Sequence, residues 1–333
     1  MKTNLIIILC LAANMIVLLP NQSNATNRYW IGGTGNFNDP AHWSSSSGGS
    51  SCGCTPTTND NAIFNANSFT ADFQQVTIAV SSYCKNLTWT GVTHTPQLSG
   101  SATLYVYGSW TLSHNMIYSF TGPIYFQSSS HTETITSAGK AFNQSLYFNG
   151  GSNAGWTLQD SLVCNGGINL TNGNLFSTNG KYVSVAGFNA IFPGVPTLDI
   201  ANSTIVTSNG WNVSTNGTVV STNSSITMTG GYYFTGGSHT YNDIVFSPYS
   251  GGIDGDNIFH DVSFASDGSL GNRNIYHNVS IGGNGYIYDG NTFNDLNLTA
   301  GKTYNIYGTE TLLGNLNGSG TPGNLVTYQG SPG

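Results

Sequence analysis

Four near-copies of one heptamer recur at almost constant spacing in the C-terminal part of the chain. They are TYNDIVF, IFHDVSF, IYHNVSI and TFNDLNL, and their aromatic residues are 18, 17 and 17 positions apart: Tyr241, Phe259, Tyr276 and Phe293. Internal periods near twenty residues are typical of solenoids. Frequent Gly and Asn and the scarcity of helix-forming runs argue against a helical solenoid. The repeat therefore predicts an all-β protein, a β-solenoid.

The spacing inside the heptamer predicts a corner. The aromatic and the following aliphatic residue are three positions apart, as in Tyr241 and Ile244, whereas inward residues of a regular strand are two apart. We expect the polar pair between them, Asn242 and Asp243 in the first copy, to turn the chain in the left-handed conformation that Asn and Asp tolerate. Short strands should lie on both sides of that corner.

Stacking of the coils should place equivalent residues above one another, about 4.8 Å apart. The aromatic residues would then form one inner column and the aliphatic residues a second, with two polar columns at the corner. The aliphatic column would contain Ile244, Val262, Val279 and Leu296, and the polar columns Asn242, His260, His277 and Asn294, and Asp243, Asp261, Asn278 and Asp295. Parallel crossovers prefer one hand, which predicts a right-handed parallel β-helix. A β-sandwich or barrel would also have many short strands, but not columns of like residues at a fixed step.

Less regular copies extend the coils toward the N-terminus. CKNLTW from Cys84 and FNQSLYF from Phe142 follow the heptamer, and a second strand type recurs from Ile168, Ile226 and Val279. We therefore assign 81–333 to the coils, roughly a dozen turns and about 60 Å of stack. The coils continue to the last residues, YQGSPG, which is compatible with C-terminal truncation of a longer protein.

The N-terminal part divides into a signal peptide and a cap. Residues 1–25 combine Lys2, an apolar run and small residues at Ser23 and Ala25, the pattern of a cleaved secretory signal. An open solenoid end needs a cover, and 26–80 contains Trp30, Phe37 and Trp43 among glycines. We expect this segment to be an aromatic, Gly-rich N-terminal cap.

Composition limits the possible partners. Charged residues make up 6% of the chain, against about 25% in typical domains, and only 7 are Lys or Arg. Nucleic acid is therefore an improbable partner. No segment after the signal is apolar enough to cross a bilayer, so the mature chain is expected to be secreted or attached to the cell surface.

The cysteines of an exported chain can form disulfides. Cys52 and Cys54 lie in a Gly/Ser loop, and either is a candidate partner of Cys84. Zinc binding by these three residues is a weaker alternative, because no further ligand follows at a suitable spacing. Cys164 occupies an inward apolar position and is expected to be a free core thiol.

One N-terminal motif resembles a known group of proteins. YWIGGTGNFNDPAHWS from Tyr29, followed by a Gly/Ser loop, TPTTNDNAIFNANSF and CKNLTWTG, resembles the opening of bacterial secreted and cell-surface parallel β-helix proteins of the adhesin-like kind. Many such proteins are exported through the type IX secretion pathway. The resemblance covers residues 28 to about 170 by motif and implies a surface role, whereas it says little about activity. Such proteins commonly end in a sorting domain, and since this sequence ends within or just after a coil, we expect it to be part of a longer chain.

Outward-facing tyrosines are the best candidates for a ligand site. Tyr faces and Asn amides on a long flat sheet suit an extracellular polysaccharide or a glycan of a host or cell surface. The candidate tyrosines occur in GGYYF, GYIYDG and YNIYG: Tyr232, Tyr233, Tyr286, Tyr288, Tyr304 and Tyr307.

Two metal sites are conceivable, although no cofactor is required. Asp254, Asp256 and Asn257 in GGIDGDN could bind Ca²⁺, but they lack the full spacing of a Ca²⁺ loop. His260 and His277 should stack on adjacent coils and could bind a metal, but they more simply replace Asn in the corner column.

These observations favour a non-catalytic structural or adhesin-like module that binds glycans. The alternative is a carbohydrate-active enzyme, a polysaccharide lyase or glycoside hydrolase, on the same scaffold. A hydrolase requires two carboxylates a few ångströms apart. A groove with two close carboxylates, or a carboxylate beside Arg273, would favour the enzyme. A flat face of stacked Tyr and Asn would favour adhesion.

Overall fold

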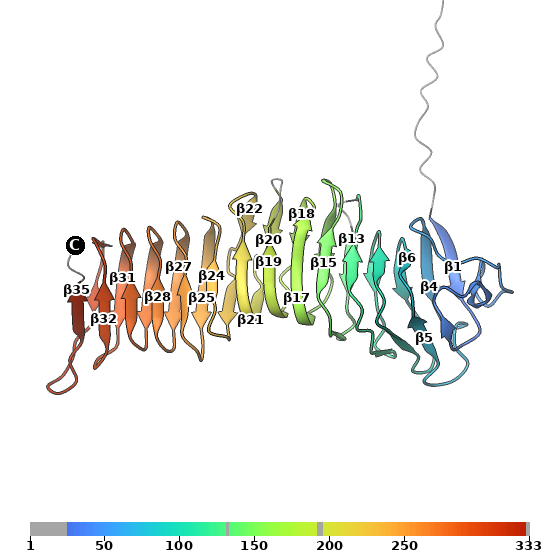
Figure 1. Cartoon of the computed structure of the whole chain (residues 1–333), viewed down its shortest axis with the longest axis horizontal. Helices are drawn as coiled ribbons and strands as arrows, with labels where there is room; N and C mark the ends of the chain where they lie inside the picture. Colours follow the sequence, from blue (N-terminus) through green and yellow to red (C-terminus); the bar gives the residue numbers. More distant parts are fainter. Residues whose placement is uncertain (1–24, 131–132, 192–195, 331–333) are drawn as a thin grey trace, which may run out of the picture.

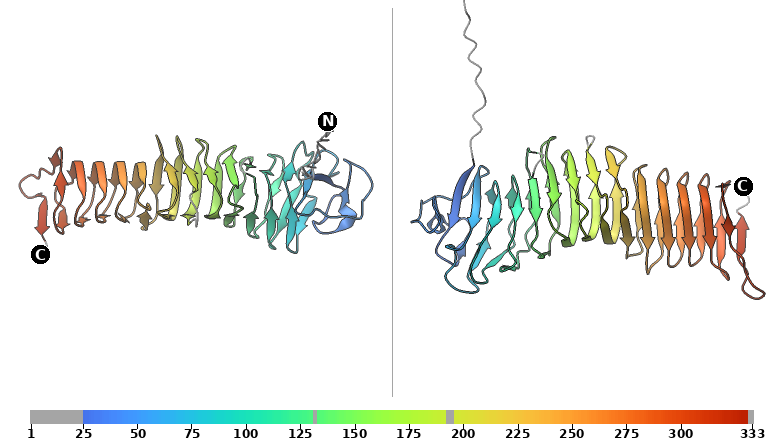
Figure 2. Two further views of the ribbon diagram at one scale, coloured as in Figure 1. Left: turned by 90° about the horizontal axis from the view of Figure 1, so that it is seen from above. Right: turned by 180° about the vertical axis from the view of Figure 1, so that it is seen from behind.

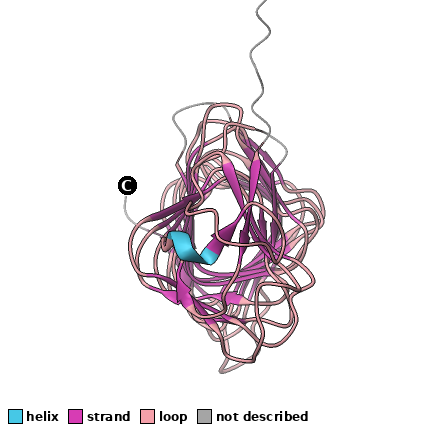
Figure 3. Ribbon diagram, turned by 90° about the vertical axis from the view of Figure 1, so that its right-hand side faces the viewer, coloured by secondary structure: helices cyan, strands magenta, loops and turns pink. Residues whose placement is uncertain are grey.

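The protein is a rod of stacked β-coils. The computed structural model describes residues 25–130, 133–191 and 196–330, so all of the predicted signal peptide except Ala25 lies outside the described residues. About 13 coils stack in parallel along the rod (Figures 1 and 2). Apart from one 3-10 turn, η1 (Pro40–His42), the regular structure of the described residues is β (Figure 3). The predicted parallel β-solenoid is confirmed, and a sandwich is excluded.

The N-terminal coils have three sheets, A, B and C. Sheet A contains β1 (Thr26–Trp30), β4 (Asp60–Phe64), β7 (Leu87–Trp89), β10 (Trp110–Thr111), β13 (Glu133–Thr136), β16 (Gly155–Leu158), β18 (Leu175–Ser177), β20 (Thr197–Asp199) and β22 (Thr218–Val220), with β3 (Trp43–Ser44) antiparallel to β1. Sheet B contains β2 (Gly35–Asn36), β5 (Gln75–Ile78), β8 (Gln97–Gly100) and β11 (Ile117–Tyr118). Sheet C begins with β6 (Ser82–Cys84), β9 (Leu104–Val106), β12 (Ile124–Phe126), β14 (Ala141–Phe142), β15 (Leu146–Asn149), β17 (Leu162–Asn172), β19 (Val183–Ala190) and β21 (Thr204–Val213).

Sheet C divides into two rows of strands after β21. The first half of β21 pairs with β23, and its second half pairs with β24. One row contains β23 (Ser225–Met228), β25 (Thr240–Phe246), β27 (Ile258–Phe264), β29 (Ile275–Ile281), β31 (Thr292–Leu298), β33 (Thr311–Leu312) and β34 (Leu316–Asn317). The other contains β24 (Tyr233–Thr235), β26 (Gly251–Ile253), β28 (Gly268–Leu270), β30 (Gly285–Ile287), β32 (Thr303–Ile306) and β35 (Thr327–Gly330). The four heptamers are β25, β27, β29 and β31.

The predicted inner columns are confirmed. The four heptamer aromatics are buried and stack from coil to coil with ring centroids 5.9, 5.3 and 5.3 Å apart. Strand pairing places Ile244 beside Val262, then Val279, then Leu296. The core is therefore continuous along the axis, and each coil buries its apolar residues against the coils on both sides.

The predicted corner differs from the observed one. Two successive residues between the buried aromatic and aliphatic positions are not buried, as expected, but each heptamer is one seven-residue strand. None of the corner residues has a positive φ. Left-handed residues occur instead at other turns, including Asn179, Asn202 and Asp256. Because every coil bends at the same place, hydrogen bonding to the neighbouring coils continues through the bend, and no break into two strands is needed.

An asparagine ladder runs through the buried turn before each heptamer. The backbone N–H of Asn257 donates to Oδ1 of Asn274 at 2.9 Å, and that of Asn274 donates to Oδ1 of Asn291 at 3.0 Å. All three side chains are buried, and their amides donate to carbonyls of the same turn. Glu310 ends the ladder by accepting from the N–H of Asn291 at 2.8 Å. These bonds satisfy backbone donors that would otherwise be buried without partners.

Aromatic residues close the N-terminal end. Trp30, Phe37 and Trp43 are fully buried, and the rings of Trp30 and Trp43 both contact Phe64 on β4. β3 covers the outer edge of β1 in antiparallel orientation. Parallel pairing already includes β4 and β5, on the N-terminal side of the boundary expected at residue 80.

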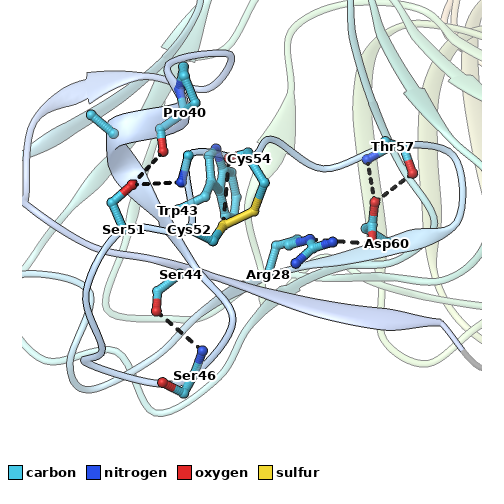
Figure 4. Close-up of a disulfide and its surroundings, with 12 residues drawn as sticks. Arg28, Pro40, Trp43, Ser44, Ser46, Ser51, Cys52, Cys54, Thr57 and Asp60 are labelled. Atoms are coloured by element: carbon cyan, nitrogen blue, oxygen red, sulfur yellow. Dashed lines mark hydrogen bonds and ion pairs between the residues drawn. A yellow bond between two sulfur atoms is a disulfide. The ribbon is translucent and has the colours of Figure 1, made fainter.

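The expected disulfide partner of Cys84 was wrong. Cys52 pairs with Cys54 in the loop after β3 (Figure 4). Cys84 is fully buried as a free thiol facing the core from β6, and burial raises its pKa. The two cysteines are only two residues apart in this Gly/Ser loop, so they pair with each other without a partner from another coil. Cys164 is a buried free thiol, as predicted, and burial raises its pKa to about 11.

The aromatic column should contribute strongly to stability. Replacing Phe259 with Ala removes a ring packed between Tyr241 and Tyr276, which should cost about 3–5 kcal/mol because the rigid stack cannot close the cavity. The neighbouring Ile258→Ala is the matched control, because Ile258 is 45% exposed. Denaturant unfolding followed by circular dichroism measures both. Equal, small losses for the two variants would contradict the stacked core.

Glu310 should make stability depend on pH. Burial raises its pKa to about 7, from a usual value near 4.5. Folding therefore favours the protonated acid. The stabilising contribution is complete below about pH 4.5 and is lost as pH rises through 7. The difference in melting temperature between the wild type and Glu310→Gln should change across pH 4.5–8 in that direction. A difference independent of pH would contradict this assignment.

Candidate ligand-binding face

One outward column runs along sheet C for most of the rod. Strand pairing places its members in successive coils: Tyr83, Tyr105, Tyr125, Tyr147, Asn169, Asn189, Asn212 and Thr235. The same pairing continued one residue beyond β26, β28, β30 and β32 adds Asp254, Gly271, Tyr288 and Tyr307. We call this column and its immediate neighbours the ligand face. It was not recognised in the sequence analysis.

The tyrosine part of the ligand face follows from strand alternation. Tyr105, Tyr125 and Tyr147 each stand between two buried apolar residues, in Leu104–Val106, Ile124–Phe126 and Leu146–Phe148, so their rings point outward. Tyr83 likewise stands between two buried residues, Ser82 and Cys84. The rings stack face to face, with successive centroids 5.1, 5.3 and 4.7 Å apart. Burial by these neighbours, with a smaller charge effect from Tyr147 and Tyr105, raises the pKa of Tyr125. The result is a continuous aromatic strip.

The asparagine part follows from a short repeat that sequence reasoning missed. Gly, a buried apolar residue, Asn and another buried apolar residue recur as GINL, GFNA and GWNV, beginning at Gly167, Gly187 and Gly210. The three asparagines lie in register, and the amide of Asn189 donates to Asn169 at 3.3 Å. The three glycines lie in register beside them. A search for this four-residue pattern would have found both columns.

A groove of about 670 Å³ follows the glycine column. It lies over β15, β17, β19, β21 and β24, which are side by side in the middle of the rod (Figure 1). Its floor is open because the glycines have no side chains there. A Cβ atom at Gly187 would lie 3.7 Å from Asn209 and 3.9 Å from the Gly210 carbonyl, so even ordinary side chains would fit. The groove is therefore open because these positions are glycines, although the surrounding backbone would leave room for larger side chains.

Aromatic residues stand at both ends of the groove. Tyr147 lines one end, and Tyr232 and Tyr233, 53% and 59% exposed, line the other. The Tyr233 ring lies over Gly252 of the next coil, where a Cβ atom would come within 2.4 Å of it. Between the two ends, the Asn column presents amide donors and acceptors along one side. Charged residues are absent from the described lining of this groove.

Of the six candidate tyrosines, some were expected to face solvent, and the structure shows which of them do. Tyr232, Tyr233, Tyr286 and Tyr288 are exposed, and Tyr307 is partly buried with its ring stacked on Tyr288 at 5.1 Å. Tyr304 was wrongly placed, because it is fully buried. In YNIY, alternation turns Tyr304 inward, above Gly285, and its hydroxyl oxygen accepts from the N–H of Thr299 at 2.8 Å.

The residues expected to bind Ca²⁺ are hydrogen-bonded to other groups. Asn257 is buried, and its Oδ1 accepts from the N–H of Ser238 at 3.1 Å. Asp254 accepts from the hydroxyl of Thr235 at 2.6 Å. Asp256 is held by two hydrogen bonds of 2.7 Å from Arg273. These hydrogen bonds occupy Oδ1 of Asn257, Oδ2 of Asp254 and both oxygens of Asp256, and Ca²⁺ binding at this turn stays a prediction.

One feature named as favouring an enzyme is present. Asp256 lies beside Arg273, and both line a groove of about 350 Å³ together with Asp254, Tyr233 and Tyr288. The hydrogen bonds from Arg273 lower the pKa of Asp256. Asp256 is therefore ionised at neutral pH and unsuited to be a general acid, which needs a raised pKa. An arginine that is always protonated cannot act as a base.

A larger hollow of about 850 Å³ lies nearer the N-terminus. Its lining is mostly polar, with Asn61, Asn86, Lys85, Glu133 and several serines. Among its described lining residues, Tyr107 is the one aromatic side chain. Aromatic platforms thus gather on the ligand face instead.

Comparisons with known proteins do not indicate a function. No protein-family model, curated protein or solved structure matches the chain. Within the described residues, no helix is long and apolar enough to span a membrane.

Proposed function

We propose that this protein is a secreted or cell-surface structural module of the adhesin-like kind, and that its ligand face binds extended glycans. The observation that carries the proposal is the unbroken outward column of stacked tyrosines and asparagines beside a glycine-floored groove. The signal-like N-terminus and the resemblance to type IX secretion cargo support export to the cell surface.

The chemistry of the ligand face suits a sugar polymer. Tyr rings offer flat apolar surfaces to the C–H faces of pyranose rings, and Asn amides pair with hydroxyl groups. Equivalent groups repeat at about 4.8 Å along the rod and so form a regular linear array that a linear sugar polymer can follow. The same polar group therefore meets successive sugar units of a chain lying parallel to the rod axis.

The lining of the groove favours a neutral polymer. From Tyr147 through the Asn column to Thr235 the groove crosses four coil steps, or about 19 Å. Neither acidic nor basic side chains line this stretch among the described residues. A uronate polymer would find no cation there, so its carboxylates would lose hydration without compensation.

A carbohydrate-active enzyme is the second candidate. Its support is the placement of two carboxylates, Asp254 and Asp256, in one small groove, whereas the Asp256–Arg273 pair itself supplies neither a general acid nor a base. Release of new reducing ends or unsaturated products from a bound polysaccharide would support this candidate. Binding without product release would support adhesion.

Filling the groove should abolish glycan binding. Gly187→Phe places a ring on the groove floor, where the backbone is not left-handed and the Cβ has room. A glycan array followed by calorimetry with the best neutral ligand should show at least a tenfold loss of affinity. Tyr147→Ala should weaken binding several-fold, because one aromatic platform contributes about 1 kcal/mol.

The matched control is Ser280→Phe, which adds the same ring to an exposed position on β29, outside the ligand face. It should bind as the wild type does. Equal affinity for Gly187→Phe and the wild type would contradict the groove. No binding to any glycan by the wild-type chain, residues 26–333, would leave only a scaffolding role.

A further inference from the structure

A cluster of metal-binding side chains lies on the corner formed by β27 and β29, outside the ligand face. It contains His260, Asp261 and His277, which we call the histidine cluster. One ligand atom from each residue lies within 4.8 Å of the other two. The two imidazole rings stack on adjacent coils with centroids 4.9 Å apart and an interplanar angle of 15°. The 17-residue repeat thus places two imidazoles side by side on the surface.

The distances within the cluster match those around a small metal ion. Oδ1 of Asp261 lies 3.5 Å from Nδ1 of His260 and 3.6 Å from Nδ1 of His277. Both distances are too long for good hydrogen bonds. Ligands bound to Zn²⁺ at 2.0–2.1 Å in a tetrahedron are separated from one another by roughly 3.3 Å. The three ligand atoms all lie within 4.8 Å of one another, so a movement of about 1 Å in these exposed side chains would bring them to that separation.

Asn278 shows which way the lone pair of His277 points. Its Nδ2 lies 2.7 Å from Oδ1 of Asp261 and 3.0 Å from Nδ1 of His277. An ionised carboxylate only accepts, so the group facing it is the amide NH₂ and not the carbonyl. The same NH₂ can pair with Nδ1 of His277 only if that nitrogen accepts. The Nδ1 lone pair of His277 therefore points toward the Asn278 amide, and a metal ion bound between His277 and Asp261 would take the place of that NH₂ group.

His260 requires one adjustment. Its Nδ1 lies 3.2 Å from Oδ1 of Asp243, and a carboxylate oxygen can pair there only with a protonated nitrogen. Metal binding would move that proton to Nε2, which is open to solvent in a side chain that is 55% exposed. Tautomer exchange of this kind is available to any neutral imidazole.

We propose that His260, His277 and Asp261 bind a first-row divalent metal ion, and that Zn²⁺ occupies the site with one position open to water or a ligand. Two imidazoles and a carboxylate suit Zn²⁺ and do not suit Ca²⁺, which prefers six or more oxygen ligands. The ion would join β27 to β29 and so connect two successive coils. This proposal does not rest on the glycan-binding function.

The test is Zn²⁺ titration of tag-free protein against a chromophoric chelator at pH 7.5. Saturation at one ion per chain is expected. His260→Asn and His277→Asn should each weaken binding at least tenfold. Both variants should fold, because Asn242 and Asn294 occupy the equivalent positions of the neighbouring coils. The matched control is His94→Asn, which removes an exposed histidine beside a single carboxylate, Asp72, and should leave the affinity unchanged.

A second measurement separates a specific site from loose association. Zn²⁺ should raise the melting temperature of the wild type and of His94→Asn, since an ion bound only by the folded state stabilises it. It should not raise that of His260→Asn or His277→Asn. Wild-type affinity in either cluster variant, or no saturable binding to the wild type, would overturn the proposal.

Discussion

In-register stacking of like residues is the constraint on which the rest of the structure depends. A parallel coil can bury its inward side chains only against the coils next to it, so each level must present the shape that its neighbours require. The aromatic stack from Tyr241 to Phe293 meets this requirement with apolar side chains. The ladder from Asn257 to Asn291 meets it with hydrogen bonds between successive coils. At the end of the ladder, Glu310 places a carboxyl group where the preceding coils have an asparagine amide. The stability of this end of the rod should therefore depend on whether Glu310 is protonated.

Outward-facing residues are held in the same register, but they do not have to pack against the neighbouring coils. A column that points outward can change its chemistry along the rod, and the ligand face does so. Stacked tyrosines from Tyr83 to Tyr147 are followed by amides from Asn169 to Asn212. Because the coil spacing is fixed, any repeated surface group forms a linear array. Linear arrays fit linear polymers, and this relation connects the core of the fold to its proposed function.

The inner architecture could be predicted because it repeats at a nearly constant 17-residue step. The ligand face could not be found in that way, since loops of variable length in the N-terminal coils separate its tyrosines by 22, 20 and 22 residues. Tyr304 was misplaced because alternation was not followed through YNIY to the glycine that makes room for its ring. Cys84 was misassigned because sequence separation does not show that a β6 side chain faces the core. Asp256 and Arg273 lie on neighbouring coils, 17 residues apart. Their ion pair could be predicted only once the register between those coils was known.

The most direct test of this account is a distance measurement along one outward column. Tyr125 and Tyr288 lie in the column eight coil steps apart, so spin labels at Tyr125→Cys and Tyr288→Cys should be about 38 Å apart. A second pair at Tyr125→Cys and Asn212→Cys, four steps apart, should give about half that distance. Pulsed electron resonance can measure both, since the two free thiols of the described residues, Cys84 and Cys164, are buried. Distances that scale with the number of coils support the account, and distances that do not would contradict it.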